Sequence, residues 1–329
     1  MAGSLPWAAS DERYHPVMSF LAVLFALLLE QARPLTEHNW VHASMRGWVR
    51  WVKKSLDAGQ HHHGLLVWAM AVALPALIAA GLHLVLWYYS VVLTFVWAVA
   101  VLYVTLGFRQ FSHHFTEIRG ALERGDELAA RQALATWRRV PLEAVTPSDL
   151  LRQAIEYSVL AVHRHVLGVL VCFVVFWVMG LGPAGAVLYR LADYMAGSNA
   201  ARRGRLQAPD ELMPSESVCG VAARAWQLIN HVPARATAIA FAIVGNFEEA
   251  VANWRTIGAT TRDPNDVVVL LAAAGAVNLS LVGDVQPEGS TSARAPELAH
   301  LASLVGLVWR SVVLWMLFLA LLTLAHSVG

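Results

Sequence analysis

The longest feature in the pattern of hydrophobic and polar positions is a run of 51 residues, 58–108, without Asp, Glu, Lys or Arg. One helical crossing of a membrane needs roughly 20 apolar residues, so this run is long enough for two crossings. It is less apolar in the middle, at residues 87–90, where the aromatic side chains suit a membrane–water interface. The pattern predicts a helical hairpin, with residues 64–87 as one arm and residues 91–106 as the other.

Further apolar stretches lie at residues 18–29, 166–181, 236–244, 267–282 and 304–325. The last is long enough to span a bilayer, whereas the others are short and could be re-entrant, tilted or packed under other helices. The chain shows no extended strand pattern. We therefore expect an all-α, polytopic integral membrane protein with four to five transmembrane helices, together with short re-entrant or interfacial helices.

The charges flanking the hairpin predict its orientation. Residues 31–63 contain five basic and two acidic residues, and positively charged loops remain in the cytoplasm. Two crossings later, residues 108–164 return to the same side as a cytoplasmic helical loop. We expect one membrane domain over residues 1–329, located in the bacterial inner membrane as a multi-pass protein.

The cytoplasmic loop carries signals for helix ends. Gly125 and Asp126 suit the end of one helix and the start of the next, which predicts a helical hairpin. Another helix is expected to begin at Thr146 and Pro147 and to continue into the apolar stretch 166–181. Glycine and proline in residues 180–185 should then break this helix. Such a break near membrane depth is tolerated only where the backbone is buried in protein or lines a wet cavity.

Composition supports a membrane protein and removes some classes of site. Hydrophobic residues make up 57% of the chain and charged residues only 14%, against roughly a quarter charged in soluble domains. The only lysines are Lys53 and Lys54, so no P-loop nucleotide site is present. Two cysteines give no disulfide framework and no metal signature. A net charge of +1 is uninformative about nucleic acid; we expect the lipid bilayer, not nucleic acid, as a partner.

Several polar residues near the apolar stretches are candidates for chemistry. Glu30 and Asp193 lie beside apolar runs, where acidic groups are costly and often functional. They could equally lie at headgroup level or pair with a nearby arginine. Arg235 follows Pro233 at a predicted helix start and could hold a phosphate bidentately. Its alternative is snorkelling to lipid headgroups.

Three groups of histidines resemble metal sites at first sight, at residues 61–63, 113–114 and 163–165. Adjacent residues on a helix point in different directions, so they cannot share one ion unless the backbone is irregular. None of these groups shows the i, i+4 spacing of a helical zinc pair. We therefore favour solvated or structural roles for them.

A series of short motifs resembles the CobD/CbiB family. Arg109 to His114 is similar to its Arg-x-Leu-x-x-His motif, and Gly125 to Arg131 to its Gly-Asp-x-x-x-Ala-Arg motif. Residues 177–190 resemble the family's Trp-x-x-x-x-Gly-x-Pro-Gly-Ala-x-x-Tyr-Arg motif. Residues 230–235 resemble Asn-Trp-x-Pro-Ala-Arg, and residues 264–276 resemble a Ser-Pro-Asn … Ala-Gly-Ala pattern. The order and spacing hold from about residue 20 to residue 325.

The resemblance implies an integral membrane protein of cobalamin assembly, similar to adenosylcobinamide-phosphate synthase. Such proteins join an aminopropanol arm to adenosylcobyric acid, in an amide synthesis that uses ATP and Mg²⁺. In an active enzyme of this kind, Mg²⁺ would be held by Glu30 and Asp193. Phosphate or corrinoid side-chain groups would be bound by Arg109, His114, Asn230 and Arg235.

This chain departs from the family at acidic positions. The family's Ala-Glu-Asn-x-x-Asp-Gly stretch is replaced at residues 163–168, and its Asp-Asp falls on Trp226 and Gln227. Carboxylates are what Mg²⁺ requires, so we expect weak or lost synthase activity. In these losses the chain is similar to AmpE, and the alternative function is an AmpE-like, non-catalytic membrane regulator. The expected partner is accordingly a corrinoid or another membrane protein. A transporter is disfavoured because paired half-helix repeats are lacking.

Overall fold

The computed structural model describes residues 8–33, 40–56, 61–138, 146–200, 215–255, 263–279 and 297–328, and the structural statements below concern these residues. They form helices, with no β-strand among them. The elements, with η marking a π-helix, are α1 (Ala8–Ala32), α2 (Trp40–Leu56), α3 (His61–Trp68), η1 (Ala69–Ala73), α4 (Leu74–Tyr89), α5 (Val91–Thr105), α6 (Phe108–Glu123), α7 (Glu127–Arg138), α8 (Pro147–Val162), η2 (His163–Leu167), α9 (Gly168–Val178), α10 (Ala184–Ala200), α11 (Glu216–Ile229), α12 (His231–Val244), α13 (Phe247–Arg255), α14 (Pro264–Ala276) and α15 (Leu298–Val328).

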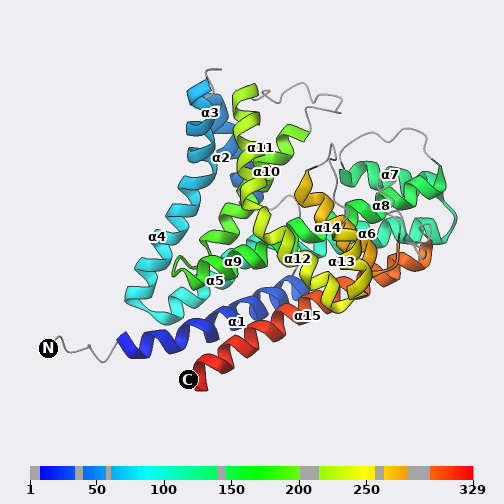
Figure 1. Cartoon of the computed structure of the whole chain (residues 1–329). Helices are drawn as coiled ribbons and strands as arrows, with labels where there is room; N and C mark the ends of the chain where they lie inside the picture. Colours follow the sequence, from blue (N-terminus) through cyan, green and yellow to red (C-terminus); the bar gives the residue numbers. More distant parts are fainter. Residues whose placement is uncertain are drawn as a thin grey trace.

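Most of these helices pack in four groups around a central helix (Figure 1). Helices α2, α3, α4, α10 and α11 stand together on one side, and α6, α7 and α8 form a small bundle on the other. Helices α12, α13 and α14 pack against one another between them, while α1 and α15 lie side by side along the lower edge. The composite helix α8–η2–α9 runs through the centre and contacts α10, α12 and α14.

The predicted hairpin in the charge-free run is confirmed. Its first arm, Gly64–Tyr89, is one helix of 26 residues. The chain reverses at Ser90, which has extended backbone, and the Ser90 hydroxyl accepts a hydrogen bond from the Leu93 N–H at the start of α5. Tyr88 and Tyr89 are 84% and 74% exposed at this tip, as the interfacial interpretation of these aromatic residues requires.

Three helices are long and apolar enough to cross a membrane: Gly64–Tyr89, Pro147–Val178 and Leu298–Ala325. The apolar stretches in α1, α5, α12 and α14 are shorter, at 10–17 residues. Helix α5 has 15 residues and rises only about 22 Å, against roughly 30 Å for the hydrocarbon core. The coarse expectation of an all-helical membrane protein is therefore met, whereas the count of four to five spans is not established by helix length alone.

The helix ends predicted for the loop 108–164 are confirmed. The turn after α6 closes with hydrogen bonds from Asp126 N–H to the Ala121 carbonyl (2.9 Å) and from Gly125 N–H to the Leu122 carbonyl (3.1 Å). This is a Schellman motif, and Gly125 has the positive φ of 73° that it requires. The Asp126 carboxylate then caps α7 by accepting from Ala129 N–H at 2.9 Å. Helix α8 begins as expected, with Pro147 in its first turn and Thr146 as its N-cap.

The predicted break after the apolar stretch 166–181 is also confirmed. Helix α9 ends at Val178 and α10 begins at Ala184, so the chain reverses within five residues. The turn lies against His83 of α4, which is 1% exposed and packs edge-on against Trp177 at 5.2 Å. The second half of the break, from Gly182 onward, is therefore covered by protein, whereas Val178 and Met179 before it are exposed. Burial in protein is a condition under which such breaks are tolerated at membrane depth.

The short apolar helices serve internal packing. Every residue of α14 except Pro264 and Asp266 is buried, and the helix packs against α12 and α13. Gly275 permits this approach, because a Cβ there would meet the backbone of Ala250 in α13 at 2.5 Å. A 13-residue helix that is enclosed in this way supports the central helix, and its Asp266 contacts Arg164 of that helix.

Candidate functional site

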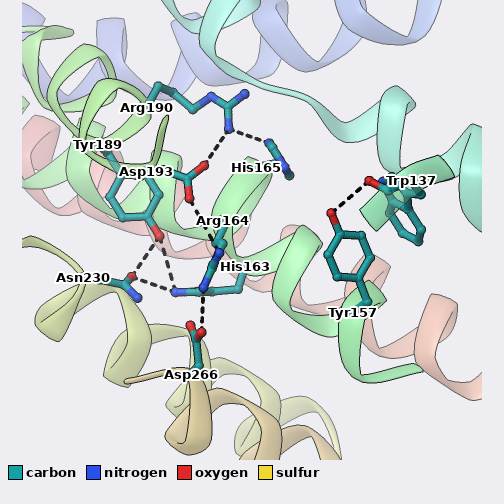
Figure 2. A network of polar contacts seen from close by, with 10 residues as sticks. All are labelled: Trp137, Tyr157, His163, Arg164, His165, Tyr189, Arg190, Asp193, Asn230 and Asp266. Carbon is teal, nitrogen blue, oxygen red and sulfur yellow. Dashed lines mark hydrogen bonds and ion pairs between the residues drawn. The ribbon is translucent and has the colours of Figure 1, made fainter. Parts of the chain in front are cut away.

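The polar centre of the protein is organised by the π-helix η2, which interrupts the long helix from Pro147 to Val178 (Figure 2). A π-turn places an extra residue in a helix and changes the directions of neighbouring side chains. Here His163 is directed toward α12, Arg164 toward α14, and His165 toward α10. The three consecutive residues therefore contact three different helices, and their partners form a connected network.

The uncharged half of this network is fully enclosed. His163 is 0% exposed; its Nε2 lies 2.8 Å from Asn230 Oδ1 and its Nδ1 lies 2.9 Å from Thr237 Oγ1. Because an amide oxygen only accepts, Nε2 carries the proton in neutral His163, and the Thr237 hydroxyl donates to Nδ1. The Tyr189 hydroxyl donates to the same Asn230 oxygen at 2.9 Å. Burial raises the pKa of Tyr189 well above its ordinary value, so this hydroxyl remains a donor.

The charged half is a chain of guanidinium and carboxylate groups. Arg164 Nη2 lies 2.6 Å from Asp266 Oδ2, and its Nη1 lies 3.9 Å from Asp193 Oδ1. Arg190 Nη1 approaches the other oxygen of Asp193 at 3.4 Å and also contacts His165 Nδ1. Two arginines thus compensate two aspartates, at a site where their side chains are 13–30% exposed.

Glu30 joins this cluster from α1. It is 5% exposed, and its carboxylate acts electrostatically on Arg190. Of the two acidic residues expected as metal ligands, Asp193 is paired with arginine. Glu30 contributes a negative charge that acts on Arg190.

Arg235 lies at the start of α12, where a second motif residue fixes its orientation. Its Nη1 donates to Asn265 Oδ1 at 2.9 Å and to the carbonyl of His231 at 3.0 Å. Asn265 is held in turn, because its Nδ2 donates to the Gln227 carbonyl and its N–H donates to Asp263 Oδ1, both at 2.9 Å. Arg235 itself is partly exposed, so an oriented guanidinium is presented at the edge of the network.

The remaining candidates, Arg109 and His114, lie on α6. The side chain of Arg109 is outside the described residues, but the start of its helix is tied to the network: Gly107 N–H donates to the His165 carbonyl at 3.2 Å. His114 lies further along α6, stacked on Trp137 at 5.6 Å, with Nδ1 3.9 Å from Glu117. Its ring therefore belongs to the contacts between α6 and α7.

The sequence interpretation missed the main members of the site. His163, Arg164 and His165 were set aside because adjacent residues on a helix diverge. They do diverge, but the π-helical backbone directs all three into one network. On the sequence alone, adjacent residues could share a site only if the backbone were irregular, and the backbone is irregular at residues 163–167. Asp266 gave no signal, although it lies only three residues beyond Asp263, the N-cap of α14.

The residues present do not fit a Mg²⁺ site built by the protein. Mg²⁺ demands oxygen ligands in near-octahedral geometry. Among the described residues, no group of three or more His, Cys, Asp or Glu side chains could hold a metal ion. The carboxylates of Asp193 and Asp266 are engaged by arginines, and Glu30 lies under the influence of Arg190.

Fold and site together define an all-helical membrane protein whose interior polar network joins segments that are distant in the sequence. The family model described as CobD/Cbib protein matches residues 19–304. A cobalamin biosynthesis protein CobD from Stutzerimonas stutzeri is 30% identical over 325 residues, covering 91% of this chain and 96% of that protein. A protein of the same name from Chromobacterium violaceum is 30% identical over 235 residues, covering 70% and 71%. No solved structure matches the chain.

The chain therefore belongs to the CobD/CbiB family. The resemblance read from its motifs is confirmed, and three of those motifs meet in space: Tyr189 contacts Asn230, and Arg235 contacts Asn265. Gly107, just before the Arg109–His114 motif, contacts His165 in the stretch where the chain departs from the family. Neither relative favours the AmpE-like alternative, because both carry the cobalamin biosynthesis name.

Proposed function

We propose that this protein serves cobalamin biosynthesis as an integral membrane protein that binds a corrinoid and has weak or lost amide-forming activity. The observation that supports this most is the convergence of the family motifs on one polar network around η2. Membership of the family supports a corrinoid as the substrate class, and the engagement of Asp193 and Asp266 by arginines supports a reduced activity. ATP and Mg²⁺, which the family's amide synthesis uses, would be required only if activity remains.

Arg235 is the residue best placed to bind an anionic group of the corrinoid or of a phosphate. Asn265 holds one edge of its guanidinium, and a partly exposed edge remains available. A planar guanidinium recognises carboxylate and phosphate oxygens bidentately, which an ammonium cannot do. Arg109 would add a second positive charge, since its helix begins beside the network.

Corrinoid binding tests this proposal without requiring turnover. Purified protein in detergent is titrated with adenosylcobyric acid, and binding is followed by quenching of tryptophan fluorescence. We expect saturable binding, weakened roughly tenfold by Arg235→Lys, a loss of about 1.4 kcal/mol. The loss is limited because lysine keeps the positive charge, although it lacks the planar, bidentate donors of the guanidinium.

The matched control is Arg119→Lys, which makes the same change at an exposed pair with Glu123 and should leave binding unchanged. Equal binding by the wild type and Arg235→Lys would favour the snorkelling interpretation of Arg235. Absence of binding to the wild type would contradict the proposed function.

We further propose a topology for the single membrane domain, residues 1–329, in the bacterial inner membrane. The three long apolar helices would cross the bilayer, with α1 and α5 supplying the fourth and fifth spans. The loops 31–63 and 108–164 would both face the cytoplasm, and the bilayer would cover the exposed apolar faces of α4 and α15.

Cysteine labelling tests this orientation. In a background lacking Cys172 and Cys219, an impermeant maleimide added to intact cells should not label Ser55→Cys or Ser148→Cys, both exposed positions. Tyr89→Cys, at the tip between α4 and α5, should be labelled and serves as the positive control. Strong labelling at residue 55 or 148 from outside would overturn the topology.

A further inference from the structure

The guanidinium of Arg164 lies between two carboxylates that come from different helices. Asp266 of α14 contacts it at 2.6 Å and Asp193 of α10 at 3.9 Å, and each aspartate side chain is 15% exposed. Figure 2 shows Arg164 between the two acids, with Arg190 on the far side of Asp193. Two acidic groups that converge from separate elements and retain access to solvent would ordinarily be candidates for binding a divalent cation.

Here a side chain already occupies the position between those acids. Mg²⁺ takes oxygen ligands at about 2.0–2.1 Å, often through one or two carboxylates together with substrate phosphates. A guanidinium hydrogen-bonded to Asp266 and adjacent to Asp193 uses the same oxygens and supplies the opposing charge. Arg190 supplies a second positive charge, which also faces His165 and Glu30.

The surroundings of Arg164 suit an organic cation better than a metal ion. Its guanidinium carbon lies 5.6 Å from the centre of the Trp226 ring, within the range of a cation–π contact. An indole ring offers no oxygen to a metal. At the next position, the Gln227 carbonyl is occupied by the Asn265 amide. The two positions at which the family resemblance places acids thus carry an indole and an uncharged amide in place of carboxylates.

We propose that Arg164 is the resident cation of this site, so that the protein holds a fixed guanidinium, rather than a divalent metal, between Asp193 and Asp266. Arg164 is a positioning residue in this account, because it fixes α10 and α14 against the central helix. The inference concerns the cation alone, and it holds whether or not a corrinoid binds.

Manganese binding, measured by the loss of the free Mn²⁺ signal in electron paramagnetic resonance, tests the proposal. Purified wild-type protein in detergent should leave the signal unchanged at submillimolar Mn²⁺. Arg164→Gln removes the charge between the two acids, so that Asp266 is freed and Asp193 keeps only its contact with Arg190. This variant should gain affinity for Mn²⁺ by roughly tenfold or more. Adding Asp266→Asn to that variant should remove the gained binding.

Arg152→Gln is the matched control, because it removes another arginine from the same helix. Arg152 pairs with Asp149 at 3.0 Å, and the Asp149 carboxylate also accepts from the Thr146 hydroxyl at 2.7 Å. Removal of Arg152 therefore releases one carboxylate that keeps another partner, and it should create no Mn²⁺ site. Binding of Mn²⁺ by the wild type that is lost in Asp193→Asn or Asp266→Asn would overturn the proposal. So would a folded Arg164→Gln variant that gains no affinity.

Removing one member of a buried ion pair destabilises a fold, and Arg164→Gln could therefore fail to fold. A second test uses the wild type and does not need this variant. Thermal unfolding of the wild type in detergent should be unchanged by millimolar Mg²⁺, because no site binds the ion in the folded state. A Mg²⁺-dependent rise in Tm that disappears in Asp266→Asn would contradict a resident guanidinium, irrespective of how Arg164→Gln folds.

Discussion

Purified protein supplied with ATP, Mg²⁺, adenosylcobyric acid and aminopropanol phosphate should form little or no coupled corrinoid. Reactions that pass through phosphoryl transfer depend on positioned metal ions to offset developing charge. In this chain the acids that remain, Asp193 and Asp266, are engaged by arginines. Losing several kcal/mol of stabilisation costs about tenfold in rate for each ~1.4 kcal/mol, so we expect turnover to be roughly a thousandfold or more below that of an active synthase.

The same deficit should appear in cells. The chain is expected not to restore growth to a strain that lacks its adenosylcobinamide-phosphate synthase. Robust turnover in vitro that Glu30→Gln or Asp193→Asn abolishes would contradict the prediction and restore the enzyme interpretation. Asp149→Asn is the control, since Asp149 lies near the start of α8, where it pairs with Arg152 and accepts from the Thr146 hydroxyl. Its change should not affect any turnover.

Replacing Gly182 by alanine should destabilise the protein strongly. Gly182 has a φ of 59°, and a Cβ there would overlap the imidazole of His83. The left-handed backbone costs an ordinary residue roughly 1–2 kcal/mol, and inserting a methyl group into a well-packed site typically costs a further 1–3 kcal/mol. We therefore expect Gly182→Ala to lose about 2–5 kcal/mol, measured as a large fall in Tm in detergent.

Gly180→Ala separates the two contributions. Gly180 also has a positive φ, 77°, but nothing lies within 4 Å of the position of its Cβ. This variant should lose only the backbone contribution, and its Tm should fall clearly less than that of Gly182→Ala. Equal falls in Tm would show that contact with His83 does not matter and that the turn is stabilised by backbone geometry alone.

Local chemistry made the helix boundaries predictable. Gly125 with Asp126, Thr146 with Pro147, and the glycines after Trp177 all specify ends through hydrogen bonds and backbone angles that depend on a few neighbouring residues. The charge-free run predicted its hairpin in the same way, because hydrophobic length is a property of the sequence itself.

The site could not be predicted to the same depth. The π-turn at residues 163–167 leaves no signature in hydrophobic periodicity, and without it the contacts of His163 and Arg164 could not be anticipated. Asp266 and Asn265 enter the network because α14 packs on α12, which is a consequence of tertiary packing. The family motifs named Asn230 and Arg235, which lie in or beside the polar network, but their partners came only from the structure.

The contact between α1 and α15 has a consequence for biogenesis. Met18, Ala22 and Ala26 on α1 belong to the same buried core as Leu301, Leu304 and Val308 on α15. The 265 residues between Ala32 and Leu298 take roughly 13–53 s to translate at 5–20 residues per second. During that interval α1 must wait at the membrane without its final partner. The protein thus completes its lower layer only after α15 has been synthesised, and ribosomes that stall before α15 would leave an unsealed intermediate for quality-control proteases.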